Sequence, residues 1–146
     1  MKRSTAMRSA LLAAFKTQFD GSIIGIFSGP VPTTADAALS PTDHVLLCAI
    51  SKEGNGTGVT FDSDTSQGVL VKNPSELWKG EVRNGGTATF FRMFKMADDQ
   101  TAASTVLPRL QGTVGLLDAD LNLSSVDFVP GNERRLKTFT VAVPAG

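Results

Sequence analysis

The segment from Leu70 to Arg92 constrains the fold most, because it combines the only tryptophan, an Asn-Gly pair and a strand-like run that is apolar on both faces. It reads Leu-Val-Lys-Asn-Pro-Ser-Glu-Leu-Trp-Lys-Gly-Glu-Val-Arg-Asn-Gly-Gly-Thr-Ala-Thr-Phe-Phe-Arg. An Asn-Gly pair between two strand-like runs favours a tight antiparallel connection. The segment therefore predicts a hairpin-like unit of a β-sheet, and it contains no residue set typical of a catalytic site.

The rest of the chain after Gly21 also has the composition of short strands separated by Gly, Pro, Asn and Asp. About eight runs have strand length and strand residues. They cover residues 23–27, 45–50, 69–72, 77–82, 87–94, 109–116, 121–128 and 136–143. This number of strands predicts a mostly β fold, namely an antiparallel β-sandwich or jelly-roll-like domain.

The run 87–94 is unusual because both of its faces are apolar. Phe90 and Phe94 alternate onto one face, and Phe91 and Met93 alternate onto the other. A strand of this kind lies between two layers or at an interface. Arg92 shares the Phe90 face, where we expect it at the rim of the sheet.

The N-terminal residues 4–20 predict an α-helix that precedes the β body. The apolar positions recur at three- and four-residue spacing, which aligns them on one face. These positions are Met7, Ala10, Leu11, Ala14, Phe15 and Phe19. Ser4 or Thr5 can cap the start, and Gly21 can supply a left-handed residue past the end. The face is expected to pack on the chain's own sheet or on a neighbouring subunit.

The length of 146 residues indicates one domain, residues 1–146. Within it we expect the helix at 4–20, a strand plus a long loop or arm at 21–43, and the β body at 44–146. The arm, from Gly29 to Thr42, is rich in Pro, Thr and Ala and is longer than most connections. Loops of this length are often functional or become ordered against a partner.

The charge balance gives no reason to expect a nucleic acid or a membrane as partner. Fourteen basic and fourteen acidic side chains cancel, so no long-range field attracts the chain to a polyanion. The apolar N-terminal stretch is interrupted by Lys16 and Gln18, too soon for a membrane span, and it has no clear cleavage boundary of a signal peptide. The single cysteine, Cys48, lies in an apolar run and is expected to be a small buried hydrophobe.

No motif predicts a catalytic, cofactor or metal site. The only histidine, His44, opens a strand and belongs to no triad signature. The segment from Asp118 to Asn122 resembles the first half of a calcium loop, but Leu123 replaces the required glycine, and a turn is the better interpretation. Asp62 and Asp64, and likewise Asp98 and Asp99, are expected to be solvated loop residues. A hydrolase with an unusual site, centred on His44 or Asp120, is the least favoured alternative.

The order of motifs along the chain resembles that of small virion structural proteins of tailed bacteriophages. The motifs that carry the resemblance are the N-terminal amphipathic helix, Ile24-Gly-Ile-Phe-Ser-Gly-Pro30, Gly68-Val-Leu-Val-Lys-Asn-Pro-Ser-Glu-Leu-Trp-Lys-Gly80, Gly86-Thr-Ala-Thr-Phe-Phe-Arg92, Leu110-Gln-Gly-Thr-Val-Gly115, Asp120-Leu-Asn-Leu-Ser-Ser125 and Phe139-Thr-Val-Ala-Val-Pro144. The resemblance implies a non-enzymatic part of a phage particle, made in the host bacterial cytoplasm and assembled with copies of itself and with other virion proteins. A head-associated cement or decoration protein is favoured.

Several residues are expected to contact such partners. The first choice is the arm, with Gly29, Pro30, Val31 and Pro32, and the second is the helix face around Met7, Leu11 and Phe15. Four aromatic residues are assigned to the core and not to a contact surface: Trp78, Phe90, Phe91 and Phe139. The basic cluster of Arg134, Arg135 and Lys137 is expected in solvent or at an interface rim. The alternatives are a neck, tail or baseplate protein that contacts neck or tail neighbours, and a receptor- or carbohydrate-binding module.

Overall fold

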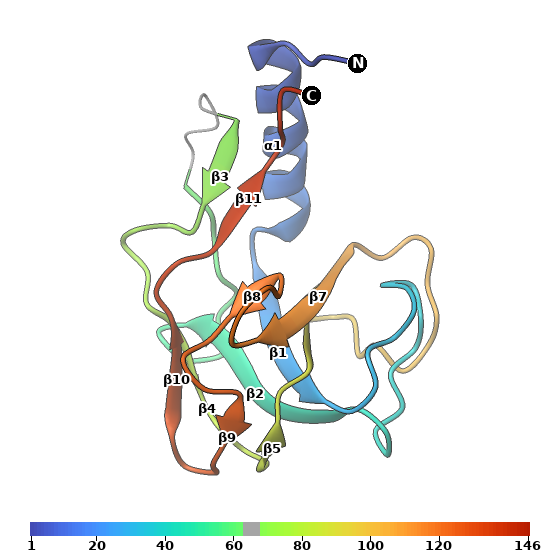
Figure 1. Cartoon of the computed structure of the whole chain (residues 1–146), viewed down its shortest axis with the longest axis vertical. Coiled ribbons are helices and arrows are strands. Elements are labelled where there is room, and N and C mark those ends of the chain that lie inside the picture. The colour runs from blue at the N-terminus through green and yellow to red at the C-terminus, as the bar shows by residue number, and fades with distance from the viewer. Residues whose placement is uncertain (63–67) are drawn as a thin grey trace.

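The computed structural model describes residues 1–62 and 68–146, and it shows a mostly β chain that begins with one helix (Figure 1). The helix is α1 (Thr5–Phe19). The strands are β1 (Ser22–Ser28), β2 (Val45–Lys52), β3 (Val69–Val71), β4 (Trp78–Glu81), β5 (Gly86–Thr87), β6 (Phe90–Lys95), β7 (Arg109–Gly115), β8 (Leu121–Asn122), β9 (Asp127–Phe128), β10 (Glu133–Leu136) and β11 (Thr140–Ala142). The predicted mostly β class with an N-terminal helix is confirmed. Asp64 lies outside the described residues.

Seven strands form one sheet in the order β10-β4-β2-β1-β6-β7-β8. Neighbouring strands are antiparallel except β7 and β8, which pair in parallel. The sheet curls, so that its two end strands, β8 and β10, line the same cleft (Figure 1). Two small sheets, β3–β11 and β5–β9, complete the sandwich-like fold.

The hairpin-like unit predicted between Leu70 and Arg92 is wrong. Its four strands pair with strands elsewhere: β3 with β11, β4 with β2 and β10, β5 with β9, and β6 with β1 and β7. The groups beside the Asn-Gly pair explain why. Arg83 N donates to Leu47 O at 2.8 Å, and Asn84 Nδ2 donates to Leu46 O at 2.8 Å. Bonds to the distant strand β2 therefore replace the local turn.

The predicted strand runs lie at the right places, but three of them are each divided into two short strands. Run 121–128 contains β8 and β9, and run 87–94 contains most of β6 and one residue of β5. Run 136–143 contains β11 but only Leu136 of β10, whose other residues were not predicted as strand. In each case the two halves belong to different sheets. The chain changes sheet at these corners, a rearrangement that composition does not reveal.

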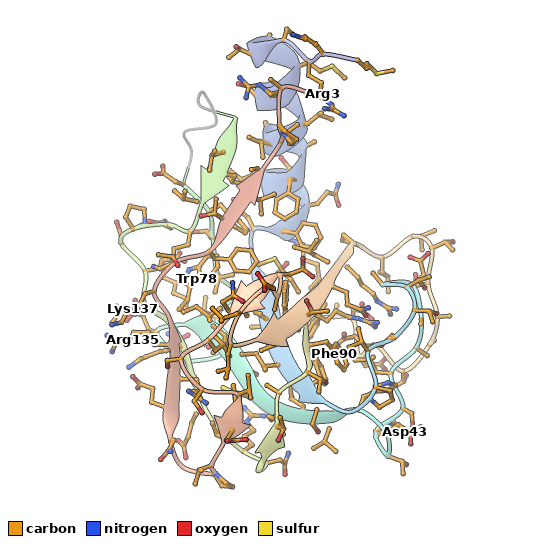
Figure 2. All side chains as sticks on the ribbon, in the orientation of Figure 1. Arg3, Asp43, Trp78, Phe90, Arg135 and Lys137 are labelled. Atoms are coloured by element: carbon orange, nitrogen blue, oxygen red, sulfur yellow. The ribbon has the colours of Figure 1, made fainter. Side chains whose placement is uncertain are left out.

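The core is built around four aromatic rings from distant parts of the chain. Phe61 meets Trp78 edge-on at 5.3 Å between ring centroids, and Phe139 lies 5.7 Å from Trp78 and 5.9 Å from Phe91. Trp78 is fully buried, and its Nε1 donates to Glu76 Oε2 at 2.8 Å, so the indole N–H is satisfied inside the core (Figure 2). The core assignment of Trp78, Phe90, Phe91 and Phe139 is confirmed.

Helix α1 begins and ends as its sequence predicts. The Ser4 hydroxyl accepts from Met7 N at 3.2 Å, which satisfies one of the free N–H groups of the first turn. Gly21, two residues past the last helical residue, has φ +84°. The helix projects from the body beside β3 and β11 (Figure 1). The C-terminal residues follow it, because Arg3 N donates to Ala145 O at 2.6 Å.

The predicted stripe of α1 is buried only at its C-terminal end, where Phe19 is buried and Phe15 packs against the core. Leu12, outside the stripe, is fully buried, whereas Met7 and Leu11 are 51% and 44% exposed. The positions one turn from Leu12 are Arg8 and Lys16, and both are only partly exposed. Lys16 Nζ donates to Phe61 O at 3.0 Å, so its aliphatic stem covers the core while its charge is satisfied. Because Arg8 and Lys16 lie on the buried face, the spacing of apolar residues does not identify that face.

The adjacent leucines of α1 provide a matched test of this orientation. We expect Leu12→Ala to lower the free energy of unfolding by about 2–5 kcal/mol, because it opens a cavity in the core. Leu11→Ala should change it by about 0.5 kcal/mol or less, because that side chain lies near solvent. Urea denaturation of both variants gives the comparison. Equal effects, or a larger effect at Leu11, would contradict the observed helix face.

Candidate functional site

The arm from Gly29 to Thr42 folds back onto the outer face of β6. Leu39 is buried against Phe27 and Phe90 and forms a second small core with them. Gly29 closes the arm at its base with φ +100°, and a Cβ atom there would lie 1.9 Å from Asp43 O. Only glycine fits this close approach. The arm is therefore ordered by its own chain.

Arg92 holds the arm from inside the molecule. Its side chain is fully buried, and its guanidinium donates to Ala37 O at 2.8 Å and to Gln111 Oε1 at 2.6 Å. Gln111 Nε2 in turn donates to Pro32 O at 2.8 Å. Burial, and then the nearby Arg109 charge, lower the pKa of Arg92 to about 10, so it remains cationic at neutral pH. The expected place of Arg92 at the sheet rim is wrong, because the arm covers it.

A buried ion pair joins the start of β7 to the loop that follows β6, and Arg109 Nη1 also donates to Asp36 O of the arm at 3.2 Å. Arg109 Nε donates to Asp98 Oδ2 at 2.6 Å, and Arg109 Nη2 donates to Asp98 Oδ1 at 2.8 Å. This bidentate pair lowers the pKa of Asp98 and raises that of Arg109. Leu39 N also donates to Gln100 O at 2.8 Å. The arm and residues 96–108 thus form one braced lobe at the side of the sheet (Figure 1).

The two residues named for a hydrolase stabilise local structure. His44 Nδ1 accepts from Ser40 N at 3.0 Å, and its ring meets Phe90 edge-on at 5.7 Å. Asp120 Oδ2 accepts from Thr113 N at 2.9 Å and from the Thr113 hydroxyl at 3.1 Å. The two side chains line different clefts. The segment from Asp118 to Asn122 connects β7 to β8, as the turn interpretation predicts.

Two further features bear on ligands and membranes. In residues 1–62 and 68–146, no three His, Cys, Asp or Glu side chains gather closely enough to hold a metal ion. Within the same described ranges, no helix is long and apolar enough to cross a membrane.

Cys48 is fully buried, and burial raises the pKa of its thiol to about 11, so the thiol is protonated at neutral pH and a poor nucleophile.

The residues expected to contact partners divide into two groups. Met7, Leu11, Pro30 and Val31 are exposed, and their side chains are available to a neighbour. The other three, Phe15, Gly29 and Pro32, serve the chain's own structure. The Phe15 ring lies 4.6 Å from Phe19 and 5.6 Å from Phe61 between centroids, so it belongs to the edge of the core.

More exposed apolar side chains lie on the connecting loops than on the sheet faces. Val106, in the braced lobe, is 87% exposed, and Leu117, in the turn after β7, is 82% exposed. The neighbours Leu107 and Leu116 are 44% and 56% exposed. These loop tips and the outer face of α1 present large aliphatic side chains to solvent. Neither loop was singled out by the sequence analysis, because both lie between strand-like runs.

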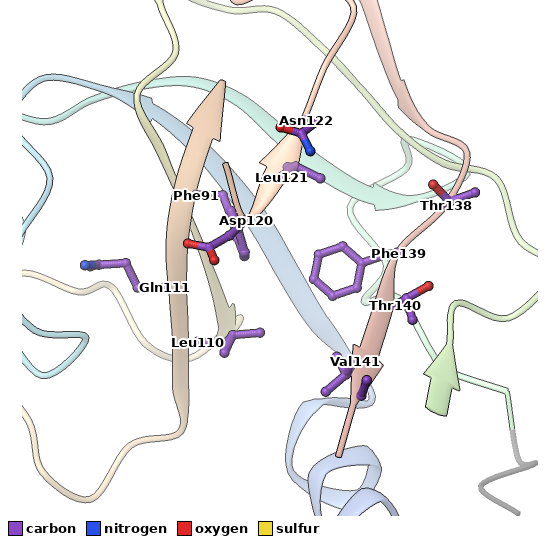
Figure 3. A pocket seen from close by; sticks show the side chains of 11 residues that line it. Phe91, Leu110, Gln111, Asp120, Leu121, Asn122, Thr138, Phe139, Thr140 and Val141 are labelled. Atoms are coloured by element: carbon purple, nitrogen blue, oxygen red, sulfur yellow. The ribbon is translucent and has the colours of Figure 1, made fainter. Parts of the chain in front are cut away.

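A groove of about 500 Å³ runs along the seam of the curled sheet. Figure 3 shows β7 on one side and β11 on the other, with the Phe139 ring between them. Phe91, Leu110, Leu121 and Val141 also line it. The groove continues past Thr138 into a second cleft of about 410 Å³ beside β10, which contains Arg134, Arg135 and Lys137. The two clefts share Leu121, Asn122 and Thr138 and together form one continuous groove.

Comparison with known protein families, with curated proteins and with solved structures found no match for this chain.

The groups that brace the lobe were missed by sequence reasoning. The expected place of Asp98 in a solvated loop is wrong, because its side chain is buried against Arg109. Arg92, Asp98, Arg109 and Gln111 lie far apart in sequence or in runs that look like ordinary strands and loops. One signal was available: an arginine at an inward position of a strand that is apolar on both faces. Such a residue requires buried acceptors, and the nearby arm carries the carbonyl oxygens that serve as acceptors.

The Asp98–Arg109 pair predicts a specific pH dependence of stability. Because the folded-state pKa of Asp98 is lowered, its contribution is present above the unfolded-state pKa of about 3.9 and is lost as pH falls through the folded-state value. We expect Asp98→Asn to lower the free energy of unfolding by about 3 kcal/mol at pH 7, because it leaves Arg109 without its counter-ion. The difference in the free energy of unfolding between Asp98→Asn and wild type should become smaller below about pH 4.

Asp99→Asn is the matched control, because Asp99 is the adjacent acidic residue and is exposed. It should have little effect at pH 7. Guanidinium denaturation at several pH values measures all three proteins. A penalty for Asp98→Asn that stays constant down to pH 2 would show that the ion pair is not its source.

Proposed function

We propose that this protein is a non-enzymatic structural component of a tailed bacteriophage virion, and specifically a head-associated cement or decoration protein. Its partners are then copies of itself and other virion proteins, and it is made in the host bacterial cytoplasm before assembly. The order of sequence motifs suggests the virion class. The structural support comes from how the chain distributes its polar and apolar side chains.

The observation that carries the proposal is that the buried charged groups act as braces while apolar groups are displayed outward. Among the described residues, the buried charged side chains include Glu76, Arg92 and the Asp98–Arg109 pair, and each bonds to a loop or strand of its own chain. Meanwhile Leu11, Val106 and Leu117 project from the surface. Many modest contacts of this kind suit a subunit held in a lattice, where linked contacts raise the effective concentration.

A neck, tail or baseplate location fits the same surface and remains the alternative within the virion. A receptor- or carbohydrate-binding role fits less well. The chain has nine phenylalanines, one tryptophan and no tyrosine. All ten aromatic rings lie in the described residues and none is exposed, whereas a sugar site needs an exposed ring on which the sugar can stack.

The presence of the protein in particles tests the proposal directly. Phage particles should be induced from the bacterium or prophage that carries the gene and purified on a density gradient. Mass spectrometry should then find this chain at a fixed copy number per particle, and cryo-electron microscopy should place it on the head. An expressed chain that is absent from intact particles would refute the virion role, and density in the tail would favour the alternative.

Charge substitutions on the projecting surface test which faces make the contacts. Leu11→Asp and Val31→Asp should each lower the copy number in particles by about tenfold or more, because each places a charge in an apolar contact. Both side chains are exposed, so the stability of the free protein should hardly change. Thr17→Asp, also exposed on α1 but away from Leu11, is the control and should assemble normally.

A further inference from the structure

The groove at the seam is bounded by a strand edge of β7 that is only partly used. Residues alternate in an antiparallel pair, so those of β7 that bond to β6 are Leu110, Gly112 and Val114. The backbone groups of Arg109, Gln111 and Thr113 point the other way. The parallel strand β8 reaches only Val114 and Gly115, and Asp120 caps Thr113 N at 2.9 Å. In the part of the chain that the structure describes, the outward N–H and C=O of Gln111 have no backbone partner.

The opposite wall of the groove is a second free edge. In the β3–β11 pair, Val141 faces Leu70, and the flanking bonds are Lys72 N to Phe139 O and Val143 N to Gly68 O, both at 3.0 Å. The alternation directs the backbone groups of Thr140 away from β3, and residues 138–142 line the groove. Within the described ranges, these outward groups of Thr140 also have no backbone partner.

The groove floor and its far end add side-chain specificity. Apolar groups line the middle, including Leu110, Phe139 and Val141. Lys137 lies just past this stretch on the exposed side of the molecule (Figure 2), and it has no hydrogen-bond or ion-pair partner among the described residues. Arg135, its neighbour in the same cleft, pairs with Glu133 at 3.3 Å. The end of the groove beside β10 therefore favours an acidic group.

We infer that this groove binds an extended segment of another protein, which adds a strand between β7 and β11 and places an acidic residue beside Lys137. The open N–H and C=O groups of Gln111 and Thr140, on two strands that line the same groove, are matched by an extended backbone, which offers donors and acceptors along both of its edges. The chain's own C-terminal residues are held along Arg3, since Arg3 N bonds to Ala145 O at 2.6 Å. They are not free to fill the groove.

The occupant is therefore a partner strand with apolar side chains at alternate positions, which the floor of the groove accepts. The inference goes beyond the proposed function, because it names the conformation and chemistry of the bound segment. It also stands independently of the virion role, since it rests on strand edges alone. If purified particles lack this protein, the virion role is refuted, but the inference about the groove is not affected.

A peptide pool provides the probe for the test. It consists of ten-residue peptides that alternate Thr with Val, Ile or Leu and carry Asp-Glu at one end, in one pool at the N-terminus and in another at the C-terminus. Binding should slow hydrogen exchange at the amides of Gln111 and Thr140, which are free in the protein alone. The amides of Leu110 and Val141, already paired, are internal controls. Peptides that are N-methylated at alternate residues, and so lack half of the donors, should bind about tenfold more weakly or not at all.

Matched variants test the two parts of the proposed contact. Thr140→Pro removes the N–H that points into the groove and should weaken binding about two- to tenfold, whereas Thr140→Ala keeps that N–H and should bind normally. Lys137→Glu should weaken binding about threefold or more at low salt and much less at high salt. Lys2→Glu makes the same charge change at the far end of α1 and should have no effect.

Three results would overturn the inference. The first is that neither pool slows exchange at Gln111 and Thr140 at peptide concentrations up to about 1 mM, the weak limit of specific binding. The second is that binding shifts residues of α1 in place of the groove. The third is that both amides are already protected in the free protein in a concentration-dependent way, because a second copy of the chain then fills the groove. The inference is supported if peptide slows exchange at the Gln111 and Thr140 amides and if wild type and Thr140→Ala bind the peptide equally.

Discussion

The burial of β6 on both faces is the constraint on which the rest of this structure depends. Phe91 and Met93 pack into the main core, while Phe90 and Arg92 point to the opposite side. That second face needs a cover that is apolar at one point and rich in carbonyl oxygens at another. The arm supplies both, with Leu39 against Phe90 and the backbone of Ala37 against Arg92. A loop therefore covers the face of β6 that points away from the main core.

The same requirement explains how the chain uses its charged groups. A buried guanidinium needs acceptors for its N–H groups. The two Nη groups of Arg92 find them in the arm and in Gln111, whereas its Nε has no hydrogen-bond partner among the described residues. The Asp98–Arg109 pair then fixes the neighbouring loop. The ionisable groups inside the molecule are thus engaged in holding loops in place. The apolar side chains on α1 and at the loop tips remain outside, and this arrangement suits the assembly role proposed above.

The curled sheet has a second consequence at its seam. Its end strands approach each other without pairing, because β8 is two residues long and β10 is followed by a chain that leaves for the β3–β11 sheet. Unpaired strand edges are normally protected by charge, by short length or by cover. Here Asp120 caps one position of β7 and leaves Gln111 open. The groove is therefore a place where strand edges keep backbone groups open, while apolar side chains line its floor.

The sequence by itself determined the features that depend on neighbouring residues: the ends of α1 at Ser4 and Gly21, the places of the strands, the two-sided burial of β6 and the burial of Trp78 and Phe139. Caps, alternation and large aromatic side chains carry this information locally. Only the tertiary structure decided which strands pair, which face of α1 is buried and what covers Arg92. The Asn84-Gly85 signal was overruled by bonds to β2, and Leu12 was hidden between Arg8 and Lys16. These outcomes depend on contacts between residues far apart in the chain, and no local pattern records them.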